Sequence, residues 1–346
     1  MNENSDLTEW IQRRKAQELP EYITQKPWCD FKEEFIEVGV SKDRMNLISW
    51  VPIPSAGYHQ QGTQATETAA TIVYISHGLH EHILKYTPVA EELTKRGMIV
   101  YGADHMGHGL SYGTRGLVKD HKKIISDQIE VINMIRTRHS SPSGIKLFML
   151  CHSMGTLIAM NSITKLECSL SGVCLSGIAT VPGPAAASPF GMECLYPLGQ
   201  SSVGICLASC LSSINEQGPA APILMEAIVN SWVEREIWKK DPRRFTGDIM
   251  NKSAYEVLSM TNSGKKNLPN ITCPVLIIHG RDDEICYPVG ATETFYTLGT
   301  RSEYKEMVIF DGLKHEMFRD DGCEKVIDCM ATFFEKYSKE EFSILD

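Results

Sequence analysis

Short apolar runs alternate with segments of helical periodicity along most of the chain. The runs expected to form strands are Thr71–Ser76, Met98–Tyr101, Lys146–Leu150, Val173–Leu175, Pro274–Ile278 and Lys305–Phe310. The segments expected to form helices are Val89–Arg96, Lys123–Arg138, Met154–Leu166, Val289–Leu298 and Cys323–Tyr337. Continuous apolar strands that alternate with helices are typical of a mostly parallel sheet covered on both faces. The pattern therefore predicts an α/β fold.

Two stretches depart from this alternation. Near the start, Phe35–Val40 and Met45–Val51 predict an antiparallel hairpin at the edge of the sheet. Later, residues 169–214 contain Glu193 as their only charged residue, and Ile223–Trp232 is apolar enough for an amphipathic helix. An interruption of this length favours an inserted cap over a poorly patterned part of the core. We expect a polar extension at 1–30, a core formed by 31–180 and 240–346, and an apolar cap at 181–239.

The composition narrows the functional classes. The chain has 346 residues, 42% of them hydrophobic, and a net charge of −9, which argues against broad electrostatic binding of nucleic acid. The polar N-terminal residues do not resemble a secretory signal, and no apolar run approaches the ~18 residues of a membrane span. We expect a cytoplasmic protein, with peripheral membrane contact through the cap as an open alternative. The eleven cysteines are scattered without a Cys-x-x-Cys pair, which favours free thiols over disulfides or a zinc ribbon.

A serine stands between one predicted strand and the helix that follows it. The segment reads Cys151-His152-Ser153-Met154-Gly155. One interpretation is an ordinary turn with a small polar residue. The other is a nucleophile elbow, a strained strand-to-helix turn that exposes the serine for attack.

Residues further along the chain favour the elbow. A serine hydroxyl needs a base to take its proton and a group to orient that base. Asp283 and His315 each follow a predicted strand, and Ser, Asp, His is the chain order of α/β-hydrolases. Ligand sites in open α/β sheets form at these carboxyl ends of strands. The backbone N–H groups of Leu79 and Met154 are the candidate donors to an oxyanion.

Five motifs resemble those of the monoglyceride-lipase group of α/β-hydrolases, which carry a His-Gly-x-Gly-Glu-His loop and a Gly-His-Ser-Met-Gly elbow. The matching segments are SHGLHEH at 76–82, YGADHMGHGLSYG at 101–113, CHSMG at 151–155, PVLIIHGRDDEIC at 274–286 and DGLKHEMF at 311–318. The family motif Gly-x-x-Asp selects Asp283 over Asp282 as the triad's acid, and the family's histidine falls on His315. The resemblance implies an α/β-hydrolase fold and a carboxylester hydrolase with a lid over an acyl tunnel and no cofactor.

The chain departs from the family pattern at several positions. Cys151 and Thr156 replace glycines of the elbow, and a histidine replaces a glycine of the oxyanion loop. At the head-group end, a tryptophan, a lysine and a phenylalanine stand where the family has Tyr, Arg and His. Such groups discriminate between substrate hydroxyls, so these changes weaken the prediction of monoacylglycerol but not that of ester hydrolysis. The candidate substrate-binding residues are His80, Glu81, Lys85, Trp238 and Phe318.

The hypothesis is a serine carboxylester hydrolase that acts on a lipid ester and cleaves monoacylglycerol to fatty acid and glycerol through an acyl-enzyme. The alternatives are a lysophospholipase or other carboxylesterase of the same fold, a serine peptidase, and a scaffold that has lost catalysis. The apolar cap favours a lipid over a peptide. The presence of Ser153, Asp283 and His315 argues against a scaffold.

Two groups of residues have competing interpretations. Cys286, three residues after Asp283, is either a small buried residue or a thiol whose modification blocks the site. Histidines gather in two loops, but without the His-Glu-x-x-His spacing of a zinc site, so we expect no metal. These histidines are His77, His80, His82, His105 and His108.

Overall fold

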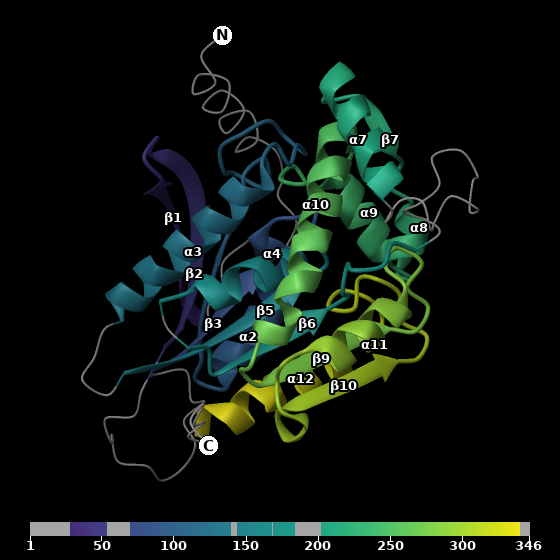
Figure 1. Ribbon diagram of the computed structural model, residues 1–346. Coiled ribbons are helices and arrows are strands. Elements are labelled where there is room, and N and C mark those ends of the chain that lie inside the picture. The colour runs from purple at the N-terminus through teal and green to yellow at the C-terminus, as the bar shows by residue number, and fades with distance from the viewer. Residues whose placement is uncertain (1–27, 54–69, 140–143, 168, 184–201, 340–346) are drawn as a thin grey trace.

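The computed structural model describes residues 28–53, 70–139, 144–167, 169–183 and 202–339 (Figure 1). Residues 1–27 of the expected polar extension lie outside this description. The same holds for residues 184–201 of the expected cap.

An eight-stranded sheet forms the centre of the described fold, in the order β1-β2-β4-β3-β5-β6-β9-β10. Its strands are β1 (Cys29–Val38), β2 (Asp43–Pro52), β3 (Ala70–Ser76), β4 (Ile99–Ala103), β5 (Ile145–His152), β6 (Gly172–Ser176), β9 (Val275–Gly280) and β10 (Lys305–Phe310). The six strands β4, β3, β5, β6, β9 and β10, which are neighbours in this order, pair in parallel, whereas β2 pairs antiparallel with both β1 and β4. The predicted mostly parallel sheet with a hairpin at its edge is confirmed.

The side chains of each central strand alternate between two cores, one on each face of the sheet. Ile72 and Tyr74 of β3 enter the first core, and Val73 and Ile75 enter the second. The helices of the first face are α3 (His121–Arg138), α4 (Met154–Ser162), α10 (Asn251–Asn267) and α11 (Pro288–Thr297), and those of the second are α2 (Thr87–Lys95) and α12 (Cys323–Lys339). Short 3-10 turns are η2 (Ile83–Tyr86), η3 (Ile163–Lys165), η5 (Leu268–Asn270) and η6 (Ser302–Tyr304). Burial of both faces explains why the strands are apolar at consecutive positions.

Local chemistry sets several element ends. The Asp120 carboxylate accepts hydrogen bonds from the backbone N–H groups of Lys122 and Lys123 and so caps the first turn of α3. Pro288 begins α11, where its missing N–H has no helical partner to lose. Gly39 leaves β1 with a φ of +69°, a conformation that glycine adopts without strain.

The chain between β6 and β9 forms a further layer beyond the carboxyl end of the sheet, at the upper right of Figure 1. Its described elements are α7 (Ser202–Ile214), β7 (Pro219–Ala221), α8 (Met225–Ile228), α9 (Trp232–Lys240) and β8 (Ile249–Met250). The helix α10 leads from this layer back to the first face of the sheet. The sequence analysis did not anticipate α10, which packs against α7 on one side and α4 on the other. The β7–β8 pair joins segments on either side of the predicted cap boundary at residue 239, and the boundary stays a prediction.

The single helix predicted at 223–232 is wrong. The short helix α8 is followed by extended backbone at Val229, and α9 begins as a separate helix. The carboxylate of Asp320 accepts hydrogen bonds from the N–H groups of Asn230 and Ser231, both at 2.9 Å. These bonds to the loop after β10 take the place of helical hydrogen bonds. The apolar pattern of the segment does not reveal them because the partner lies 90 residues away.

Candidate active site

Ser153 lies on the sharp turn between β5 and α4. Its backbone has a φ of +52° and a ψ of −121°, a conformation that is strained for a residue with a Cβ. The Ser153 N–H donates to the carbonyl of Ser176 at 3.0 Å. Gly155 passes so close to β3 that a Cβ on it would lie 2.1 Å from the carbonyl oxygen of Ser76. A strained serine held at the end of a strand is the geometry of a nucleophile elbow.

Three side chains from the ends of three strands form one hydrogen-bonded chain. The Ser153 hydroxyl donates to His315 Nε2 at 2.8 Å, and His315 Nδ1–H donates to Asp283 Oδ2 at 2.8 Å. The proton is assigned to Nδ1 because a carboxylate can only accept. His315 and Asp283 are both buried. The structure thus brings together the three residues that the sequence analysis selected.

Charges and hydrogen bonds among the three side chains shift the pKa values of Asp283 and His315 in the direction opposite to burial. Burial raises the pKa of Asp283, but the charge of His315 and the hydrogen bonds from His279 and His315 outweigh it and hold that pKa well below its usual range. Burial lowers the pKa of His315, but the carboxylate of Asp283 outweighs this effect, and the pKa of His315 is raised above its ordinary value. Asp283 is therefore an anion that stabilises the imidazolium form of His315.

The loop after β3 lies directly beside the serine. A Cβ on Gly78 would lie 2.9 Å from the Cβ of Ser153, so this approach requires glycine. The carboxylate of Glu81 accepts the N–H of Gly78 at 2.9 Å and holds the loop in place. Leu79 from this loop and Met154 from the start of α4 both line the cavity together with Ser153. The two residues chosen as oxyanion donors are thus brought to the same site.

A cavity of about 150 Å³ opens beside Ser153 and His315. The segment between β6 and β9 supplies apolar lining residues Pro222, Ile223, Ile228, Ile249, Val257 and Leu258. Cys286 also lines the cavity, and burial, together with the charge of Asp283, raises the pKa of its thiol well above the ordinary value. An apolar space with the nucleophile in its wall suits the hydrocarbon part of an ester.

The sequence pattern of the family described as Serine aminopeptidase, S33 matches residues 67–322. The chain belongs to this family. It is a serine hydrolase with the α/β-hydrolase fold.

Individual relatives of this S33 hydrolase support the resemblance to the monoglyceride-lipase group. The monoglyceride lipase homolog of monkeypox virus is 26% identical over 253 residues, which cover 72% of this chain and 83% of that protein. Human monoglyceride lipase is 24% identical over 257 residues, covering 74% and 78%. A soluble variant of monoglyceride lipase from Saccharomyces cerevisiae, solved in complex with a substrate analog, has a TM-score of 0.72 and 18% identity, covering 94% of this chain and all of that one. This structural likeness confirms the fold.

Four of the five candidate substrate-binding residues of this S33 hydrolase are not among the described residues that line the cavity. Glu81 lines the cavity. His80, Lys85, Trp238 and Phe318 are almost fully buried and are not among the described residues that line it. Their side chains are occupied by contacts within the protein, and direct contact of these four residues with the substrate stays a prediction.

His80 and Phe318 illustrate these contacts within the protein. The ring of His80 packs edge-on against Phe245 and hydrogen-bonds to the carbonyl of Gly116 at 3.2 Å. Its φ of +61° explains why the family has glycine at this position. Phe318 packs against the ring of Tyr86, with 6.1 Å between centroids.

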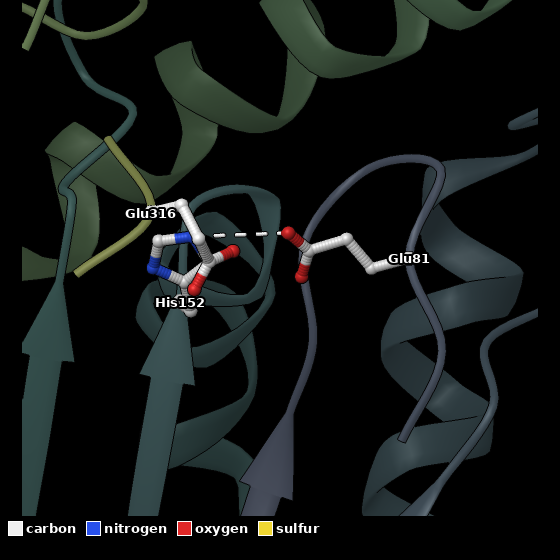
Figure 2. A group of neighbouring side chains, drawn as sticks. All are labelled: Glu81, His152 and Glu316. Carbon is white, nitrogen blue, oxygen red and sulfur yellow. Dashed lines mark ion pairs between the residues drawn. The ribbon is translucent and has the colours of Figure 1, made fainter. Parts of the chain in front are cut away.

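Lys85 belongs to a buried cluster of charged groups beside the triad. Its ammonium group contacts the carboxyl groups of both Glu81 and Glu316. Figure 2 shows Glu81 and Glu316 with His152, whose Nε2 lies 3.8 Å from Glu81 Oε1. The ligand atoms of these three residues lie within 4.8 Å of one another, close enough to share a metal ion. Since Lys85 already supplies a cation to both carboxyl groups, the cluster is an ion-pair network.

The histidines that gather in two loops hold the backbone of this region together. His77 Nε2 accepts the N–H of His105 at 2.9 Å, and His77 Nδ1 donates to the carbonyl of Gly78 at 2.7 Å. His82 Nε2 lies 2.7 Å from Asp241 at the end of α9. These contacts join the oxyanion loop to the loop after β4 and to the end of α9.

Two further residues at the site, Arg244 and His279, were not predicted from the sequence. Arg244 lines the cavity, and its guanidinium lies 3.7 Å from the ring centroid of Trp238. His279, near the end of β9, lies 3.1 Å from Asp283. No local signal distinguished Arg244 from the other basic residues between β6 and β9. His279 could have been selected from the sequence, because it immediately precedes the Gly-x-x-Asp motif.

Proposed function

We propose that this protein hydrolyses monoacylglycerol to a fatty acid and glycerol through an acyl-enzyme on Ser153. The observation that carries the proposal is the hydrogen-bonded chain from Ser153 through His315 to Asp283 in the wall of an apolar cavity. The similarity to human and monkeypox virus proteins named as monoglyceride lipases supports the choice of substrate.

Acylation follows from the order of the hydrogen bonds. Ser153 Oγ attacks the ester carbonyl carbon while its proton passes to His315 Nε2. The oxyanion that forms is bound by the backbone N–H groups of Leu79 and Met154. Asp283 stabilises the imidazolium. The bond to the glycerol oxygen then breaks, and His315 gives its proton to that oxygen.

Deacylation repeats the same steps with water as the nucleophile. Water gives a proton to His315 Nε2 and attacks the acyl carbon, and the bond to Ser153 Oγ breaks as the proton returns to this oxygen. The acyl chain lies among the apolar residues of the cavity, where its burial contributes about 0.8 kcal/mol for each CH₂ group. Because this lining comes largely from the segment between β6 and β9, that segment selects for a hydrocarbon chain.

The test is release of glycerol and fatty acid from a monoacylglycerol by the wild type and by Ser153→Ala. We expect the substitution to lower kcat by about 10⁴-fold or more, and Ser302→Ala, on the exposed turn η6, to leave it unchanged. A Ser153→Ala enzyme that retains turnover would refute the assigned nucleophile. A wild type that labels with a fluorophosphonate at Ser153 but does not cleave monoacylglycerol would refute the substrate alone.

A lysophospholipid is a second candidate substrate, and Arg244 favours it. The guanidinium of Arg244 is permanently charged, and Arg244 lines the same cavity as Ser153. Guanidinium groups bind phosphate through paired, charge-assisted hydrogen bonds. The deciding assay compares a monoacylglycerol with its 3-phosphate, two esters that differ only in the phosphate. Faster turnover of the phosphate ester supports this candidate, and slower turnover excludes it.

Peripheral membrane contact is proposed for the cap, through other side chains than those of the helix predicted at 223–232. Ile223 lines the cavity and Ile228 is buried, so neither presents its side chain to a membrane as the predicted helix at 223–232 would have done. The exposed apolar side chains of this layer are Leu207, Leu211, Ile214, Leu224, Trp232 and Val233. None of the helices in the described ranges is long and apolar enough to cross a bilayer.

The membrane proposal is tested by co-sedimentation with phosphatidylcholine vesicles. Replacing Leu207, Leu211 and Ile214 of α7 together by serine removes apolar surface that would insert into the interface. We expect the bound fraction to fall, whereas Val40→Ser, in the exposed hairpin turn away from the cap, leaves it unchanged. Equal binding of the triple variant and the wild type would refute the proposal.

A further inference from the structure

His279 is a fully buried histidine next to the acid of the triad. It lies near the carboxyl end of β9, four residues before Asp283, with an exposed fraction of 0%. Its Nε2 lies 3.1 Å from Asp283 Oδ2 and 2.9 Å from the carbonyl oxygen of Cys286. The oxygen that it approaches is the same one that accepts the hydrogen bond of His315.

The opposite ring nitrogen of His279 determines which tautomer is present. The backbone N–H of Ile178, just after β6, points at His279 Nδ1 at 3.3 Å. A backbone N–H is only a donor, so Nδ1 must be an acceptor without a proton. The single ring proton therefore sits on Nε2, which donates to the carbonyl of Cys286 at 2.9 Å and lies 3.1 Å from Asp283 Oδ2. His279 is a neutral donor in this arrangement.

The remaining oxygen of the carboxylate is held by the backbone. Asp283 Oδ1 accepts the N–H groups of Ile285 and Cys286 at 2.9 and 2.8 Å. With His279 and His315 on Oδ2, four donors surround one carboxylate. Two backbone donors orient one oxygen, and His279 orients the other toward His315.

We propose that His279 is a positioning residue of the triad, which locks the carboxylate of Asp283 in place and limits how strongly that carboxylate stabilises the imidazolium of His315. The inference rests on the proposed roles of Ser153, His315 and Asp283. A donor on Oδ2 disperses part of the negative charge that faces His315. Without this donor the imidazolium becomes more stable, and His315 gives up its proton only at higher pH.

Titratable groups face both histidines of this arrangement. Asp283 and the thiol-bearing Cys286 lie on the loop after β9, and His315 lies on the loop after β10. His315 is also faced by the carboxyl groups of Glu81 and Glu316 and by the ring of His152, 4.9 Å away between centroids. Asp283 is the group that the His279 donor acts on directly, and His315 is the group whose titration reports the effect. Cys286 contacts His279 through its backbone carbonyl.

Two substitutions separate the donor from the volume of the side chain. His279→Gln places an amide oxygen toward the N–H of Ile178 and an amide NH₂ toward Asp283, so both hydrogen bonds are kept. His279→Leu retains the volume and loses both. The rate at which a fluorophosphonate labels Ser153 is measured against pH for each protein, together with kcat and KM on a soluble short-chain ester.

We expect His279→Leu to lower kcat by about 10- to 100-fold, the usual effect of losing a hydrogen bond to a charged group, with KM little changed. The pH at which its labelling rate falls to half on the acid side should be higher than that of the wild type. His279→Gln should keep a rate within about threefold of the wild type and leave this pH unshifted. Superimposable pH profiles of wild type and His279→Leu would overturn the inference, as would a His279→Gln enzyme as impaired as His279→Leu.

A measurement on the wild type covers the case in which His279→Leu does not fold. Long-range ¹H–¹⁵N spectra, with His279→Gln used for assignment, report the tautomer of each histidine ring. We expect His279 to remain the neutral Nε2–H tautomer while His315 titrates. An Nδ1–H tautomer for His279 would overturn the inference. A wild type that is not labelled at Ser153 would instead refute the proposed function.

Discussion

The ammonium group of Lys85 contacts the carboxyl group of Glu316 in a place from which solvent is excluded. The same ammonium contacts Glu81. Burial raises the pKa of Glu81, but the charge of Lys85 outweighs it and holds this pKa well below the usual range. For Glu316 burial prevails and its pKa is raised. One cation thus stabilises one anion, and Glu316 is the carboxyl group that binds a proton more readily.

This relationship predicts unequal effects on stability. Lys85→Met leaves the Glu81 charge buried without its partner and should lower the free energy of unfolding by about 3–5 kcal/mol. Glu316→Gln replaces a carboxyl group with an amide of the same shape and should cost about 1 kcal/mol or less. Urea unfolding of both variants measures the difference. An equal loss in the two variants would show that Glu316 acts as a buried anion.

The pH dependence of activity follows from His315. Only the neutral imidazole can accept the proton of Ser153, and Asp283 raises the pKa of His315 above the ordinary value of about 6.5. As pH falls through this raised pKa, kcat/KM should decline tenfold per pH unit, with the midpoint above about 6.5. Initial rates on a soluble ester, measured at each pH at constant ionic strength, provide the profile. A midpoint below the ordinary value would contradict the electrostatics described for Asp283.

Two adjacent aspartates offer a matched test of the triad's acid. Asp283 is buried and bonded to His315, whereas Asp282 is exposed. Asp283→Asn keeps the shape but removes the charge and the Nδ1–H tautomer of His315, and should lower kcat by about 10⁴-fold. Asp282→Asn should leave kcat unchanged. Steady-state kinetics on one ester distinguish the two variants. Similar losses of kcat would mean that disturbance of the loop, and not removal of the Asp283 carboxylate, causes the loss.

Arg244 should control the choice between neutral and phosphate-bearing esters. Arg244→Gln removes the charge from the cavity and should lower kcat/KM on a monoacylglycerol 3-phosphate by about 10- to 100-fold, relative to its effect on monoacylglycerol. The ratio of the two specificity constants is the measurement. Arg301→Gln, at an exposed position, is the control. A parallel decline on both esters would assign Arg244 to the structure of the pocket rather than to its specificity.

The order of strands and helices was predictable because it depends on local patterns. Consecutive apolar residues at Ile72, Val73, Tyr74 and Ile75 predict a strand buried on both faces, and the two cores bear this out. The break at Val229 was not predictable, since it depends on hydrogen bonds from a loop far along the chain.

Some residues of the site were likewise predictable from the sequence, and others were not. Ser153, Asp283 and His315 were identified because each follows a strand and their chain order is that of a known motif, and parallel strands bring their carboxyl ends to one edge. The surroundings of the head-group residues were not predictable, because residue type and family position do not tell whether a side chain lines a cavity. Lys85 contacts two carboxyl groups and is not among the described residues that line the cavity, whereas Arg244 is one of them.

The sequence by itself determined the α/β-hydrolase architecture, the elbow at Ser153 and the identity of its two partners. These features rest on backbone periodicity, on glycine at Gly155 and on the order of motifs, all of which can be read along the chain without knowledge of contacts. Only the tertiary structure decided that His279 shares an oxygen of Asp283 with His315. The physical reason is that a hydrogen bond or an ion pair depends on distances of a few ångströms between loops, and those distances exist only after the sheet has brought the loops together.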